Sequence, residues 1–119
     1  MSTQKIANRL SELCKQGDFM KAQKELFADN AVSIEPNATP AFDKETKGLP
    51  AIMQKGEKWQ GMVEKTHKVS VSDPIITPNS FAMKISMDVT MKERGRMAIE
   101  EIAVYNVKDD KIVSEEFFM

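Results

Sequence analysis

The chain has 119 residues, 41% of them hydrophobic, and its 17 basic and 18 acidic side chains leave a formal net charge of −1. This length suits one domain over residues 1–119 that buries a core without disulfides or metal, and the balanced charge argues against a nucleic-acid binder. We expect no signal peptide, and no apolar run approaches the roughly 18 residues of a membrane span. Since Cys14 is the only cysteine, we expect a cytoplasmic protein.

The N-terminal third predicts two helices and a strand. Ser2 or Thr3 can cap a first helix, whose apolar residues Ile6, Leu10, Leu13 and Cys14 lie at helical spacing. A second helix is expected over about Phe19–Phe27. A short strand over Ala31–Glu35 then ends at a proline.

The middle of the chain predicts a loop, a third helix and a further strand. Residues 36–47 have turn composition and no period, so they predict a loop at the mouth of whatever the sheet encloses. Gly48-Leu-Pro50 opens a helix, with the proline acceptable in its first turn. Lys55 and Lys58 on this helix are interpreted as part of a solvated face. His67 then alternates with polar residues in a strand, and residues 75–78 read as a connector.

The last forty residues predict a meander of three long antiparallel strands. Apolar and polar residues alternate six times between Phe81 and Lys92, which is the period of a half-buried strand. Gly95 and the Asp109-Asp110 pair lie where tight hairpin turns need a positive φ. Helices packed on one face of a curved antiparallel sheet of four to six strands define the α+β class.

Three motifs in register resemble one superfamily. Phe27-Ala-Asp-Asn-Ala, leading through a short strand to Glu35-Pro36, resembles the ketosteroid isomerase branch of the nuclear transport factor 2-like superfamily. Gly48-Leu-Pro-Ala-Ile52 and the final hairpin, Val104–Val113, resemble its third-helix start and last turn. The chain is most similar to the SnoaL-like (polyketide cyclase-like) relatives. The resemblance implies a cone-shaped (cystatin-like) fold, an apolar pocket at its wide end and a homodimer.

The same resemblance implies a catalytic role for Glu35. It also shows that two hydrogen-bond donors of the isomerases have no counterpart in this sequence. Glu35 matches the carboxylate that acts as general base in the isomerases, and burial at a strand end would raise its pKa. The isomerases also use a tyrosine and a protonated aspartate as hydrogen-bond donors, an arrangement that is a known worked example of pKa tuning. These positions fall at Leu10 and Ala103, which donate no side-chain hydrogen bond. Steroid-type isomerisation is therefore not expected.

Several further residues are candidates for the pocket. His67 shares a predicted strand face with valines and is a second candidate for acid–base chemistry near Glu35, or a structural histidine. The orientation of Glu101 and Glu116 depends on hairpin register, because a slip of one residue turns a side chain to the other face. The expected pocket wall consists of Trp59, Met83, Ile85, Met87, Glu101, Ala103 and Tyr105.

Two function classes stay open. The first is a cofactor-free acid–base isomerase, cyclase or dehydratase that acts on a small apolar molecule through Glu35 or His67. The second is a non-catalytic ligand-binding or homodimeric interaction domain, with an outer sheet face that includes Ile102, Val104 and Phe117. A metal site is not expected, because one histidine without clustered ligands is a poor metal-binding set. We expect no cofactor.

Overall fold

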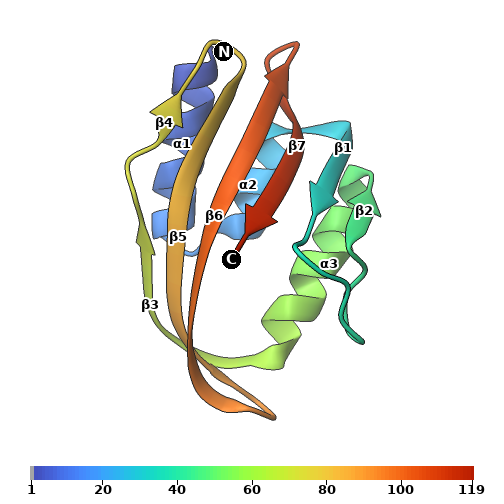
Figure 1. Cartoon of the computed structure of the whole chain (residues 1–119), viewed down its shortest axis with the longest axis vertical. Helices are drawn as coiled ribbons and strands as arrows, with labels where there is room; N and C mark the ends of the chain where they lie inside the picture. Colours follow the sequence, from blue (N-terminus) through green and yellow to red (C-terminus); the bar gives the residue numbers. More distant parts are fainter. Residues whose placement is uncertain (1) are drawn as a thin grey trace.

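The computed structural model describes residues 2–119 and places three helices against one face of a curved sheet (Figure 1). The helices are α1 (Thr3–Lys15), α2 (Phe19–Leu26) and α3 (Leu49–Met62). The strands are β1 (Phe27–Ile34), β2 (Glu45–Lys47), β3 (Val63–Val71), β4 (Ile75–Ile76), β5 (Ser80–Met91), β6 (Gly95–Lys108) and β7 (Lys111–Phe118). The α+β class and the cone-shaped fold are confirmed.

The helix ends follow from local chemistry. The Ser2 side chain accepts a hydrogen bond from the Lys5 amide at 3.2 Å and caps α1, which ends before Gly17 at a φ of 79°. Helix α2 ends at Leu26, because Phe27 is already extended and begins β1. Pro50 lies in the first turn of α3, where its missing amide proton removes no helical hydrogen bond.

The sheet has seven strands in the order β2-β1-β7-β6-β5-β3, with β4 also paired to β5. Two short strands that were not predicted bring the number above the four to six strands expected. Residues 45–47, predicted as loop, form β2 against β1, and residues 75–76, predicted as connector, form β4. The sheet is also mixed, because β1 and β7 pair in parallel while the other pairs are antiparallel.

The long hairpins have the predicted turns. Gly95, at the turn between β5 and β6, has a φ of 76°. Asp109 and Asp110 form the two-residue loop between β6 and β7 and have φ values of 52° and 63°, as such a loop requires. The hairpin of β5 and β6 pairs without a shift from Ser80↔Asn106 to Met91↔Gly95. At the bottom of Figure 1 it projects beyond the end of α3.

The core lies between the helices and the upper half of the sheet. Ile6 and Leu13 of α1 pack in one cluster with Phe81 of β5 and Ile112 of β7. The ring of Phe81 stacks on Tyr105 at 4.9 Å between centroids. Within residues 2–119, no helix is long and apolar enough to span a membrane.

We expect Phe81→Ala to lower the free energy of unfolding by about 3–5 kcal/mol, because it removes a 2% exposed ring and leaves a cavity beside Tyr105. Urea unfolding followed by fluorescence measures this loss. Ile75→Ala is the control, since that side chain is 77% exposed and its removal leaves no buried cavity. Equal losses for the two variants would contradict this placement of the core.

Candidate functional site

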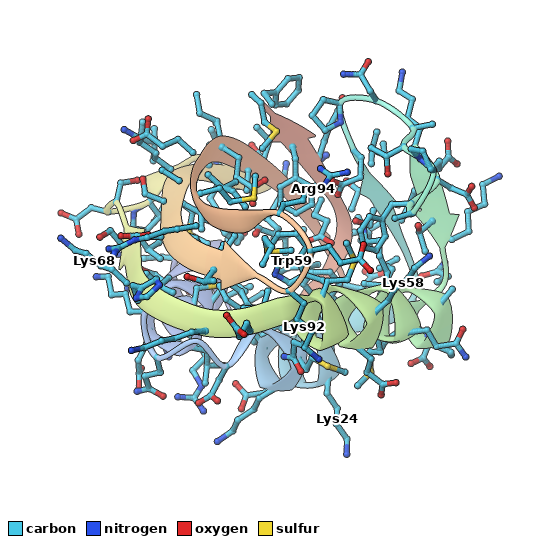
Figure 2. All side chains as sticks on the ribbon, turned by 90° about the horizontal axis from the view of Figure 1, so that it is seen from below. Lys24, Lys58, Trp59, Lys68, Lys92 and Arg94 are labelled. Carbon is cyan, nitrogen blue, oxygen red and sulfur yellow. The ribbon has the colours of Figure 1, made fainter. Side chains whose placement is uncertain are left out.

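A cavity of about 760 Å³ opens at the wide end of the cone. Its walls come from all three helices and from the inner faces of β3, β5, β6 and β7. Figure 2 looks toward this end, with Trp59 in the middle of the view between α3 and the β5–β6 hairpin. A cavity of this size accommodates a small organic molecule.

Most of the wall is apolar or aromatic. Five of the seven expected wall residues contribute to it: Trp59, Ile85, Met87, Glu101 and Tyr105. Met83 and Ala103 do not, although they point to the same side of the sheet. They form a cross-strand pair further from the open end, and both are buried in the core at 2% and 0% exposure.

The base of the cavity holds a hydrogen-bonded chain of four polar side chains. Lys55 Nζ donates to Glu35 Oε2 at 3.2 Å and to Ser33 Oγ at 2.6 Å. Ser33 Oγ donates in turn to Glu115 Oε2 at 2.7 Å. The chain therefore joins β1, α3 and β7, and three of its four members, Glu35, Lys55 and Glu115, also line the cavity.

The placement of Lys55 on a solvated helix face was wrong. Its side chain is 16% exposed and its ammonium lies 5.9 Å from the centroid of the Phe117 ring, besides the two hydrogen bonds. Lys58, one turn further along α3, does lie at the surface, where it donates to the Ala41 carbonyl and lies over the Phe42 ring. The contacts of Lys58 fix the loop before β2 against the cavity, because Phe42 is part of the wall.

Two carboxyl groups in this region have strongly raised pKa values. Burial, with a contribution from the nearby charge of Glu35, raises the pKa of Glu101 to about 7. Burial also raises the pKa of Glu115 to about 7, although the hydrogen bond from Ser33 and the charge of Lys55 act in the opposite direction. Both groups therefore exchange protons near neutral pH.

The candidate pair Glu35 and His67 is not brought into hydrogen-bonding contact. A register shift between Thr66 and Lys68 places His67 at an irregularity in β3. The ring is exposed at the rim of the cavity, where its Nε2 lies 2.7 Å from Thr90 Oγ1. Glu35 instead has its ion pair with Lys55, inside the cavity.

The orientation of Glu101 and Glu116 is settled by the strand registers. Glu101 pairs with Ile85 and faces the cavity, as the unshifted β5–β6 hairpin requires. Glu116 does not face the cavity, because the β6–β7 register shifts between Asn106 and Val107. The shift gives β7 one extra residue and turns Glu115 inward instead.

The same shift reverses the expectation for Phe117. This residue was assigned to the outer face of the sheet, but it lines the cavity, while Phe118 faces outward at 48% exposure. Ser33, Lys55 and Glu115 were not recognised as site residues. The one available signal was Glu115 itself, since an acid in an apolar strand is a candidate for a paired or functional group.

The remaining reactive groups support no other chemistry. Burial raises the pKa of the Cys14 thiol to about 12, so the thiol stays protonated and inert. Tyr105 is buried among aromatic rings, and burial raises its pKa well above the usual value for tyrosine. Among residues 2–119, no group of His, Cys, Asp and Glu side chains is arranged to hold a metal ion.

Comparison with known proteins identifies the family. Residues 1–119 match the SnoaL-like domain family, and the chain belongs to that family. A crystal structure from Mesorhizobium loti, of a candidate SnoaL-like polyketide cyclase, is 34% identical with a TM-score of 0.91, and the match covers 100% of both chains. No curated protein matches the chain.

More distant structures share the fold alone. A Xanthomonas campestris protein with a cystatin-like fold is 16% identical with a TM-score of 0.82, and the match covers 99% of this chain and 90% of that one. A Mycobacterium tuberculosis protein, crystallised with estradiol-17β-hemisuccinate, is 15% identical with a TM-score of 0.76, and the match covers 100% and 95%.

The raised pKa of Glu115 makes the stability of the protein depend on pH. The folded protein holds this proton more tightly than the unfolded chain, so the free energy of unfolding falls as the pH rises from about 4.5 to about 7. We expect Glu115→Gln to remove the share of this dependence that comes from Glu115, while Glu101 keeps its own, and to stabilise the protein at pH 8 by about 1–3 kcal/mol.

Urea unfolding at pH 5 and pH 8 measures the effect. Glu116→Gln is the matched control, because Glu116 adjoins Glu115 in sequence but faces away from the cavity. If Glu115→Gln and Glu116→Gln have the same pH dependence as the unmodified protein, Glu115 does not titrate as inferred.

Proposed function

We propose that this protein binds a small, largely apolar molecule in the cavity and catalyses cofactor-free proton transfer on it, as in an isomerisation, cyclisation or dehydration. The observation that carries the proposal is Glu101, a carboxyl group with a pKa of about 7 on the wall of an apolar cavity. No hydrogen bond to its side chain is found among the described residues, so its proton remains available to a ligand. A group with a pKa near the working pH is an effective general acid or base.

We assign complementary roles to Glu35 and Glu101. Glu35, which is paired with the ammonium of Lys55, is the carboxylate that accepts a proton from a carbon next to a carbonyl group. The electron pair of that C–H bond moves toward the carbonyl oxygen, which gains negative charge. Glu101 in its protonated form donates to this oxygen, and return of the proton to another carbon completes an isomerisation without net proton loss.

The relatives support the class of ligand. The Mesorhizobium loti protein is described as a candidate SnoaL-like polyketide cyclase, and the Mycobacterium tuberculosis protein was crystallised with estradiol-17β-hemisuccinate. Cyclised polyketides and steroids are both largely apolar molecules that contain rings and carry oxygen. The aromatic wall of this cavity, with Trp59, Tyr105 and Phe117, suits flat molecules of this kind.

Proton abstraction can be tested before the substrate is known. We expect the protein to catalyse exchange of α-hydrogens for deuterium in some members of a panel of cyclic and aryl ketones in D₂O, measured by NMR. Glu101→Gln and Glu35→Gln should each slow the exchange by a factor of about 10²–10⁴, because each removes an acid or base.

The control is Glu100→Gln, which alters the neighbouring residue on the exposed face, where Glu100 pairs with Lys84 at 3.0 Å. Its exchange rate should equal that of the unmodified protein. Ketones that bind without any deuterium incorporation would contradict the enzymatic role and favour a non-catalytic ligand-binding domain. Exchange that survives Glu101→Gln would remove Glu101 from the mechanism.

We further propose that the protein forms a homodimer through the outer face of the sheet. Ile102 and Phe118 are cross-strand partners on β6 and β7 and are 51% and 48% exposed. Exposed apolar side chains that adjoin each other favour burial against a partner. Light scattering after size exclusion should give a dimer, and Ile102→Glu combined with Phe118→Glu should give a folded monomer. A monomeric unmodified protein at 50 μM or more would contradict this interface.

A further inference from the structure

Lys55 makes further contacts besides its salt bridge with Glu35, and these contacts hold its side chain in place. We propose that Lys55 stabilises the negative charge that develops on a substrate oxygen, and that Ser33 and Glu115 are positioning residues that hold Lys55 for this task. This inference rests on the proposed proton transfer. It gives the substrate oxygen that becomes anionic in that reaction a second stabilising group besides Glu101.

The direction of the hydrogen bonds follows from the chemistry of the groups. An ammonium group has only donors, so Ser33 Oγ must accept from Lys55 at 2.6 Å. The single hydroxyl proton of Ser33 is then directed to Glu115 Oε2 at 2.7 Å. Because Ser33 is 0% exposed and Glu115 is 4% exposed, water does not compete for these bonds. The orientation of the Lys55 side chain thus depends on Glu115 through Ser33.

Lys55 retains one donor for a ligand. Its ammonium carries three protons, of which one bonds to Ser33 and one to Glu35. The side chain is 16% exposed and belongs to the cavity wall. A fixed cation on a largely apolar cavity wall stabilises a developing oxyanion, because little reorganisation is needed during the reaction.

Another interpretation of the Ser33–Lys55 contact is excluded by burial. A serine next to a lysine can act as a nucleophile in some hydrolases. Ser33, however, is fully buried and is not part of the cavity wall, so a substrate cannot reach its hydroxyl. Ser33 is therefore a positioning residue, and it connects Glu115 to Lys55 through hydrogen bonds.

Lysine NMR tests the positioning role without a ligand. In protein labelled with ¹⁵N-lysine, we expect a slowly exchanging Nζ resonance from Lys55, identified by its loss in Lys55→Met. Ser33→Ala and Glu115→Leu should remove the slow exchange, because they break the chain of hydrogen bonds. Glu115→Gln should retain it, since a glutamine carbonyl still accepts from Ser33.

Two matched probes test the role in charge stabilisation. We expect the cavity to bind 2-naphthol in its ionised form, detected by the absorption change on ionisation, more tightly than it binds 2-methoxynaphthalene. Lys55→Met should weaken naphtholate binding tenfold or more. Its affinity for 2-methoxynaphthalene should stay within about twofold of that of the unmodified protein. Glu115→Leu should show part of the same loss, and Glu115→Gln should show little.

The outcomes separate this inference from the proposed function. If the unmodified protein does not prefer naphtholate, or if Lys55→Met leaves the preference unchanged, the role of Lys55 is overturned. If Glu115→Leu is folded and keeps both the slow Nζ exchange and the preference, the positioning role is overturned. Absence of deuterium exchange in the ketone panel, with the naphtholate preference intact, would overturn the proposed reaction but leave Lys55 as an anion-binding group.

Discussion

The ammonium of Lys55 is the interaction on which the polar base of the cavity depends. It donates directly to Glu35 and reaches Glu115 through Ser33, so it connects two acidic side chains that would otherwise repel each other. An unpaired charge is costly inside a protein, and the cost falls only when a partner and hydrogen bonds are supplied. Helix α3 and strands β1 and β7 are therefore tied together at the point where the cavity begins.

One cation does not neutralise three neighbouring carboxyl groups. Burial first, and then repulsion from the neighbouring carboxylates, raises the pKa values of Glu101 and Glu115 to about 7. Each group reduces its burial cost by binding a proton, so the protein holds exchangeable protons beside an apolar space. The same feature that weakens the folded state at high pH supplies acid–base groups at neutral pH. Stability and the proposed chemistry thus both depend on the burial of these carboxyl groups beside a single cation.

The sequence predicts the strands well and the site only in part, for a physical reason. Alternation with period two is a local property, so the β5–β6 hairpin and the inward side of Glu101 follow from it. A bulge is not visible in that pattern, and each bulge reverses the faces beyond it. Shifts in β3 and β7 therefore changed the environment of His67 and exchanged Glu116 for Glu115. Lys55 looked solvated because its partners lie 20 and 22 residues away.

The structure changes the interpretation of the two missing isomerase donors. Leu10 and Ala103, at the positions expected for these donors, are both buried in the core. Glu101 lies two residues before Ala103 on the same strand and the same face, nearer the open end, and it lines the cavity. Under the proposed function, a carboxyl donor at this position would serve a ligand held closer to the mouth. In the proposed mechanism the cavity is kept while the donor lies further along the strand, so the function is argued from the site itself and not from the family motif alone.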